Sequence, residues 1–151
     1  GIALSDLTDR VFFDTDSIIE KRECKSIPEI ISDKGWDYFR AKEREVIKDI
    51  SKENNAVISL GGGALMNKDN VKALENSIFI LLKADLEVMK DRMGRDTLRP
   101  PLINNSQTEI EDIMAVRMPV YEKIANLIVD TTKLSINEVC DIILSEIDKG
   151  V

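Results

Sequence analysis

Two carboxylates stand one residue apart, directly after a short apolar run. Asp14 and Asp16 follow Val11-Phe12-Phe13, whose composition is typical of a β-strand, so both are expected at the carboxyl end of that strand. At this spacing one carboxylate can hold a hydrated Mg²⁺ while the other orients or deprotonates a hydroxyl group. The simpler alternative is that an aspartate caps the next helix and satisfies its first backbone amides.

Three arginines are candidates for binding an anion. Arg40 is followed one helical turn later by Glu43, which can fix its guanidinium group. Arg99 precedes a Pro-Pro pair, and Arg117 lies two residues before Pro119. A guanidinium binds a carboxylate or phosphate through two parallel hydrogen bonds, so arginines that converge indicate anion recognition. Taken one at a time, each is better explained as a solvated surface arginine.

Three consecutive glycines, Gly61-Gly62-Gly63, end the apolar run 56–60. A short apolar run that stops at glycines predicts a buried strand, followed by a loop in which backbone can approach another group closely. Ligands of open α/β sheets bind beyond the carboxyl ends of the strands, so this loop is a candidate binding site. A tight turn with no further role is the alternative.

Composition excludes several classes of function. Acidic residues outnumber basic ones by 28 to 21, a net charge of −7, which argues against nucleic acid or an anionic membrane as a partner. The chain has no histidine, which excludes a Ser-His-Asp triad and most zinc sites. Cys24 and Cys140 are isolated, as expected of free thiols in a reducing compartment, and we expect a cytoplasmic monomer.

The pattern of elements predicts an α/β fold. Apolar runs at 11–13, 56–60, 77–82 and 127–129 read as strands and alternate with helical patterns, which indicates a parallel sheet with helices on both faces. We expect one domain over 1–151, with a helical segment at about 15–52. The stretch at about 94–107 has no periodicity and is typical of a lid loop.

Six short motifs occur in an order that resembles shikimate kinase, within the nucleoside-monophosphate-kinase-like P-loop proteins. They are Phe12-Phe13-Asp14-Thr15-Asp16, Phe39-Arg40-Ala41-Lys42-Glu43, Gly61-Gly62-Gly63, Arg99-Pro100, Arg117-Met118-Pro119-Val120-Tyr121 and Val129-Asp130-Thr131. The resemblance implies a three-layer α/β/α kinase fold with a central parallel sheet. It also implies Mg²⁺-dependent phosphoryl transfer from ATP to shikimate, a step of aromatic amino-acid biosynthesis on the chorismate pathway.

The resemblance also implies that the helical segment at about 15–52 binds the acceptor, and it implies roles for single residues on that side. Asp16 would hydrogen-bond the shikimate hydroxyls and act as the base toward the one that is phosphorylated. Arg40 and Arg117 would clamp the substrate carboxylate, and Glu43 would hold Arg40. The glycines Gly61, Gly62 and Gly63 would border the substrate, the last two through their backbone amides.

On the nucleotide side, the resemblance implies that Arg99 swings over the transferring phosphoryl group, where positive charge stabilises the transition state. Arg92 would lie against the adenine, and the loop from Thr131 would border the adenine on its other side. Asp14 and Ser59 would sit near Mg²⁺.

The sequence lacks the family's G-x-x-x-x-G-K-[ST] motif, which cradles the nucleotide phosphates. In the family, this loop and its strand precede the segment that matches Gly1-Ile2-Ala3-Leu4, so we expect a first strand and loop of about 15–20 residues to be lacking. Without them we expect negligible turnover. A second departure is Pro101, where the family usually has leucine; it should stiffen the lid.

The missing motif has three possible interpretations. One is an incomplete or truncated kinase, and another is a relative that kept acceptor binding and lost nucleotide binding. The third is a kinase of another small polyol acid, such as gluconate. Because the acceptor-side arginines are kept together with Asp16, the resemblance favours shikimate.

Overall fold

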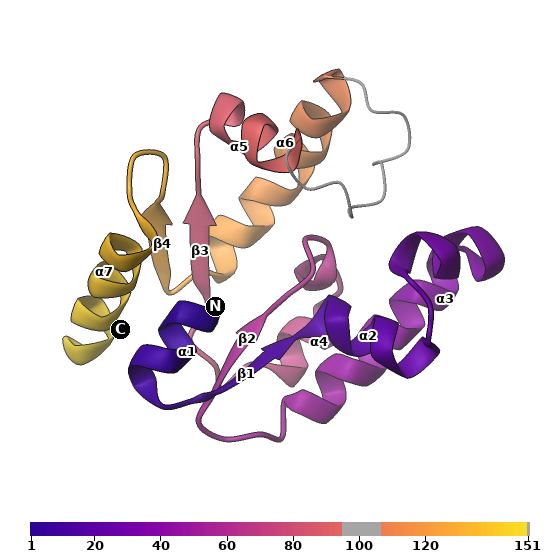
Figure 1. Cartoon of the computed structure of the whole chain (residues 1–151), viewed down its shortest axis with the longest axis horizontal. Coiled ribbons are helices and arrows are strands. Elements are labelled where there is room, and N and C mark those ends of the chain that lie inside the picture. The colour runs from indigo at the N-terminus through magenta and orange to yellow at the C-terminus, as the bar shows by residue number, and fades with distance from the viewer. Residues whose placement is uncertain (95–106, 151) are drawn as a thin grey trace. The chain divides into compact units, whose positions relative to one another are not determined.

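The structure is a computed structural model that describes residues 1–94 and 107–150, with side chains described for 1–92 and 111–150. Arg99 and almost all of the predicted lid therefore lie outside the described residues. The chain divides into two compact units, Gly1–Asn76 and Ser77–Val151 (Figure 1), and each is described by itself. The organisation of the whole chain as one domain stays a prediction.

The first unit is built around a pair of parallel strands, β1 (Val11–Asp14) and β2 (Ala56–Ser59). Their register pairs Val11 with Ala56 at one end and Asp14 with Ser59 at the other. Helix α1 (Ile2–Thr8) contacts both strands, and β1 leads directly into α2 (Thr15–Glu23). The two strands predicted from the sequence in this unit are confirmed.

A kinked helix, α3 (Ile27–Ile50), joins the two strands and packs on α2 (Figure 1). It begins with a capping box, in which the Glu29 carboxylate accepts hydrogen bonds from the backbone N–H and the hydroxyl of Ser26. Gly35, with φ 81° and ψ 170°, interrupts the helical backbone and produces the kink. The predicted acceptor-binding segment at about 15–52 thus consists of α2 and α3.

The core of this unit lies between α2, α3 and the strands. Its buried members are Ile19, Ile27, Ile30, Phe39, Val46 and Ile50, with Phe13 and Ile58 of the strands packed against them. Burial of aliphatic side chains of this size contributes about 1.5–3 kcal/mol each. This apolar cluster fixes α2 and α3 relative to the ends of the strands. After β2 come a 3₁₀ turn, η1 (Ala64–Met66), and α4 (Lys68–Ala73), both in contact with α3.

The second unit contains another parallel pair, β3 (Ile80–Lys83) and β4 (Leu127–Asp130), with Ile80 opposite Leu127. Its helices are α5 (Leu86–Gly94), α6 (Gln107–Ile124) and α7 (Ile136–Asp148), and α7 contacts β4. The strand predicted at 77–82 begins three residues late. Just before it, the Phe79 backbone N–H donates to the side chain of Asn126 at 2.8 Å and so does not join the strand ladder, although the Phe79 carbonyl accepts from the Leu127 backbone N–H at 3.2 Å.

The α/β class is confirmed, with every strand pair among the described residues parallel. The pairs form two sheets of two strands, one in each unit. In the described part of the chain, no helix is both long and apolar enough to cross a lipid bilayer.

Candidate active site

The carboxyl ends of β1 and β2 place Asp14 and Ser59 side by side, as paired residues of adjacent parallel strands. Asp14 also precedes α2, and its Oδ1 accepts a hydrogen bond from the Ser17 backbone N–H at 2.8 Å. The capping interpretation is thus confirmed for Asp14. The cap uses one carboxylate oxygen, so capping and a role near a metal ion are compatible.

Asp16 lies in the first turn of α2, and its Oδ1 is buried. This oxygen faces Gly61: a Cβ atom built at Gly61 would lie 2.6 Å from Asp16 Oδ1 and 3.3 Å from Glu43 Oε1. Only glycine fits at position 61 without displacing one of these two carboxylates. The structure therefore brings the second aspartate of the pair against the first residue of the triglycine turn.

Arg40 and Glu43 form an ion pair on α3. The Arg40 Nη1 donates to both carboxylate oxygens of Glu43, each at 2.8 Å. Glu43 is almost fully buried, with 1% of its side chain exposed, while the Arg40 side chain is 30% exposed. The predicted support of Arg40 by Glu43 is present, and the partly exposed guanidinium is held by the protein.

The guanidinium of Arg40 also lies against Gly63. A Cβ atom at Gly63 would contact Nη2 and would lie 2.9 Å from both Cζ and Nη1 of Arg40. Two aromatic rings border the same group, because Cζ is 5.1 Å from the ring centroid of Phe39 and 5.5 Å from that of Trp36. The first unit thus assembles Asp16, Arg40, Glu43 and two of the three glycines in one place.

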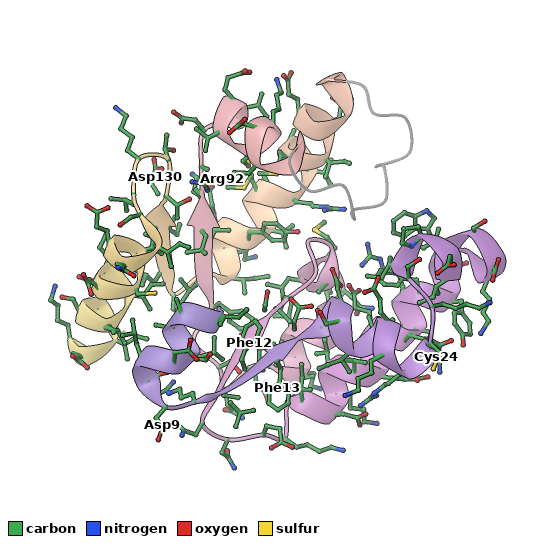
Figure 2. All side chains as sticks on the ribbon, in the orientation of Figure 1. Asp9, Phe12, Phe13, Cys24, Arg92 and Asp130 are labelled. Atoms are coloured by element: carbon green, nitrogen blue, oxygen red, sulfur yellow. The ribbon has the colours of Figure 1, made fainter. Side chains whose placement is uncertain are left out.

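In the second unit, Arg92 and Thr131 are hydrogen-bonded to each other. The Arg92 guanidinium donates to the Thr131 hydroxyl and carbonyl, each at 3.0 Å. The same hydroxyl donates to the Lys83 carbonyl at 2.9 Å, and the Thr131 backbone N–H donates there as well, at 2.7 Å. Thr131 is buried, with 7% exposed. This network joins α5 to the ends of β3 and β4, and Figure 2 shows Arg92 and Asp130 near those ends.

The turn after β4 is also hydrogen-bonded. Asp130 Oδ1 accepts from the Thr132 backbone N–H at 2.9 Å, and the Thr132 hydroxyl accepts from the Asp85 backbone N–H at 2.9 Å. Hydrogen bonds from the Thr132 side chain and backbone lower the pKa of the Asp130 carboxyl below its ordinary value of 3.8. The loop from Thr131 onward therefore has a defined shape on the unit that carries Arg92.

Arg117 lies on α6 of the second unit and is half-buried. Its predicted partnership with Arg40 involves a residue of the other unit and stays a prediction. Arg99 lies outside the described residues.

Sequence reasoning gave no role to three residues that the structure places at the first site: Thr15, Trp36 and Asn70. Thr15 is fully buried, and its hydroxyl oxygen accepts from the Gly61 backbone N–H at 3.0 Å. Asn70 is 2% exposed, and its Nδ2 donates to the Ala64 carbonyl at 2.8 Å. Trp36, one turn before Arg40 and the single tryptophan of the chain, could have been found by its helical spacing. Thr15 and Asn70 had no comparable signal.

Comparison with known proteins gives a consistent result. The model of the family described as shikimate kinase matches residues 1–148. The shikimate kinase of Thermobifida fusca is 31% identical over 147 residues, 97% of this chain and 86% of its own length. The shikimate kinase of Clostridium botulinum strain 657 is 42% identical over 135 residues, 87% of this chain and 79% of its own length.

Comparison with solved structures also finds shikimate kinases. The chain superposes on shikimate kinase from Acinetobacter baumannii in complex with shikimate with a TM-score of 0.92 and 28% identity, covering 99% of this chain and 84% of that one. For shikimate kinase from Aquifex aeolicus the TM-score is 0.84 at 33% identity, covering 98% of this chain and 87% of that one.

Proposed function

Because the chain belongs to the shikimate kinase family, we propose that it binds shikimate and transfers the γ-phosphoryl group of ATP to the shikimate 3-hydroxyl. The observation that supports this most directly is the cluster of Arg40, Glu43 and Asp16 around the triglycine turn. It places a guanidinium for a carboxylate and a carboxylate for a hydroxyl within one unit. An acid that carries ring hydroxyls requires both groups.

Asp16 acts on the acceptor hydroxyl. The hydroxyl oxygen attacks the γ-phosphorus, its proton passes to the Asp16 carboxylate, and the bond from phosphorus to the ADP oxygen breaks. The buried setting of Asp16 Oδ1 beside Gly61 keeps the carboxylate in one position. A fixed base of this kind favours transfer by holding the reacting hydroxyl in line.

Arg40 binds the substrate carboxylate. Within the described residues, Glu43 engages Nη1 of Arg40, while Nη2 faces Gly63. The ion pair therefore fixes the plane of the guanidinium and presents Nη2 at the glycine turn. Arg117 is proposed as the second guanidinium for the same carboxylate, and the backbone of Gly61, Gly62 and Gly63 as the border of the substrate site.

Arg92 and Thr131 are proposed for the nucleotide. A guanidinium held by two hydrogen bonds presents a flat face that can stack on adenine. Thr131, which is buried and bonded to Lys83 and Arg92, supports that face and does not need to touch the base itself. Arg99 is proposed to stabilise the transferring phosphoryl group.

Asp14 and Ser59 fit a water-rich Mg²⁺ site. Mg²⁺ retains several waters and is commonly bound through one or two carboxylates together with substrate phosphates. One carboxylate and one hydroxyl at adjacent strand ends meet that requirement. Bound there, the ion would neutralise phosphate charge on the nucleotide.

We also propose that the protein is a cytoplasmic monomer. Cys24 is exposed and Cys140 is buried, and both are free thiols, as is usual in a reducing compartment. Light scattering coupled to gel filtration tests the monomer directly.

Titration with shikimate, followed by the fluorescence of Trp36, tests the acceptor site. We expect saturable binding by the chain and at least tenfold weaker binding by Arg40→Lys, which keeps the charge and loses the planar fork. Arg44→Lys is the matched control, because Arg44 is an exposed arginine on the same helix. Failure of the unsubstituted chain to bind shikimate, or equal binding of gluconate, would contradict the proposal.

Calorimetry with ATP tests the nucleotide side. Arg92→Met and Thr131→Val should each weaken ATP binding while the affinity for shikimate stays unchanged. If the unsubstituted chain binds shikimate but not ATP, it is a relative that kept acceptor binding and lost nucleotide binding. Phosphoryl transfer is then measured by the release of ADP with ATP and shikimate present together.

A further inference from the structure

The triglycine turn is the most adaptable backbone of the acceptor site, yet two side chains contact it closely. Glycine loses more conformational freedom on folding than any other residue, and three in a row give a segment with little shape of its own. Gly61 lies against Asp16, and Gly63 lies against Arg40. A site of defined geometry therefore needs other groups to hold this turn in place.

Thr15 holds the beginning of the turn. Its hydroxyl oxygen accepts a hydrogen bond from the Gly61 backbone N–H at 3.0 Å, across 46 residues of sequence. Thr15 lies between Asp14 and Asp16 in the sequence, at the start of α2, and it is completely buried. The residue that separates the two aspartates thus ties β1 and α2 to the first glycine.

Asn70 holds the end of the turn. Its Nδ2 donates to the carbonyl of Ala64, the residue after Gly63, at 2.8 Å, and the side chain is 2% exposed. The Ala64 backbone N–H in turn donates to the Gly61 carbonyl at 3.0 Å, which closes the turn. Two buried polar side chains from separate helices, α2 and α4, therefore fix both ends of the glycine segment.

Small movements of this turn matter because its neighbours are close. The Asp16 oxygen and the Arg40 guanidinium occupy the space that side chains at positions 61 and 63 would take. A misplacement of about 1 Å in the groups that position a substrate can lower the reaction rate about 100-fold. The turn's position therefore sets where both groups meet the acceptor.

We propose that Thr15 and Asn70 are positioning residues that hold the triglycine turn in the shape required for acceptor binding. This inference rests on the proposed function, because shikimate is the ligand whose binding reports it. Both residues act through the turn and not through contact with the acceptor.

The experiment compares Thr15→Val, which has nearly the same shape without the hydroxyl, with Thr15→Ser, which keeps it. Asn70→Leu tests the other end of the turn. Ser5→Ala is the matched control, because Ser5 is another buried residue of this unit whose hydroxyl bonds a carbonyl, that of Ile2, at 2.6 Å. For each variant we measure shikimate affinity by Trp36 fluorescence, the urea midpoint, and hydrogen exchange of the peptide that contains the turn.

We expect Thr15→Val and Asn70→Leu to weaken shikimate binding at least tenfold and to speed exchange in the turn. Thr15→Ser should stay within about threefold of the unsubstituted chain. Ser5→Ala should lower the urea midpoint without changing affinity. Unchanged affinity in a folded Thr15→Val would overturn the proposal, as would equal loss in Thr15→Val and Thr15→Ser.

The proposed function and this inference fail in different ways. If the unsubstituted chain does not bind shikimate, the function fails, and hydrogen exchange still shows whether Thr15 and Asn70 hold the turn. If Thr15→Val does not fold, Asn70→Leu decides the question by its shikimate affinity and by the hydrogen exchange of the turn.

Discussion

Replacing Arg40 by alanine is expected to destabilise the unit Gly1–Asn76, because Glu43 then keeps a buried charge without its partner. Glu43 is 1% exposed, and both of its oxygens lie 2.8 Å from Arg40 Nη1. Removing one member of a buried ion pair costs about 3–5 kcal/mol. The Arg40 side chain is 30% exposed, so water can reach the space it leaves, and the lower end, about 3 kcal/mol, is expected.

A double-mutant cycle separates the interaction energy of the Arg40–Glu43 pair from the energy lost when packing is removed. Glu43→Gln keeps the volume and an acceptor but removes the charge, and should cost about 1–2 kcal/mol. A buried neutral amide is less costly than a buried unpaired carboxylate. Arg40→Ala combined with Glu43→Gln should therefore cost clearly less than the sum of the single changes, with a coupling of about 1.5–2 kcal/mol.

Urea unfolding followed by the fluorescence of Trp36 provides the measurement, since this is the one tryptophan of the chain. Trp36 lies 5.5 Å from the Arg40 guanidinium, so each variant is fitted with its own baselines. Arg44→Ala is the control and should change stability by less than about 0.5 kcal/mol, as expected for an exposed site. A coupling below about 0.5 kcal/mol, or equal costs for Arg40→Ala and Arg44→Ala, would show that the buried Glu43 carboxylate does not depend on Arg40.

Three further outcomes are expected. Gly63→Ala places a methyl group against the Arg40 guanidinium and should weaken shikimate binding at least tenfold in calorimetry; unchanged affinity would show that the guanidinium can move without cost. Arg117→Ala should weaken the same binding by about 2–5 kcal/mol if it pairs with the substrate carboxylate, and an unaltered dissociation constant removes it from the site. The Tyr38 hydroxyl lowers the pKa of Glu23 from its ordinary value of 4.5, so this contribution to stability is present above pH 4.5 and lost as the pH falls through the folded-state pKa. Tyr38→Phe should therefore lose less stability than the unsubstituted chain on acidification below pH 4.5, and parallel pH profiles in urea unfolding would contradict this.

Much of the first unit could be predicted from local sequence. The Arg40–Glu43 pair follows from a spacing of three on a helix, and the capping role of Asp14 follows from its place between a strand and a helix. Both depend on residues within one turn of each other. Local spacing therefore carries the geometry wherever the partners share an element.

Contacts between distant segments could not be predicted in this way. The Thr15–Gly61 bond spans 46 residues, and the Arg92–Thr131 bonds span 39. Each requires the parallel register of a strand pair, which a single sequence does not encode in a readable pattern. The hydrogen bond between Phe79 and Asn126, just before β3, likewise spans 47 residues.

The charges in the first unit also limit how the acceptor can bind. Among the described side chains of the acceptor site, Asp14, Asp16 and Glu43 are acidic and Arg40 is basic, and Glu43 pairs with Arg40. A substrate carboxylate would meet net repulsion from this set alone, within a chain whose net charge is −7. A second cation at the acceptor site would offset this repulsion. Since Arg117 is the residue proposed for that role, its removal should reduce affinity more than added salt does, because screening weakens the repulsion as well as the attraction.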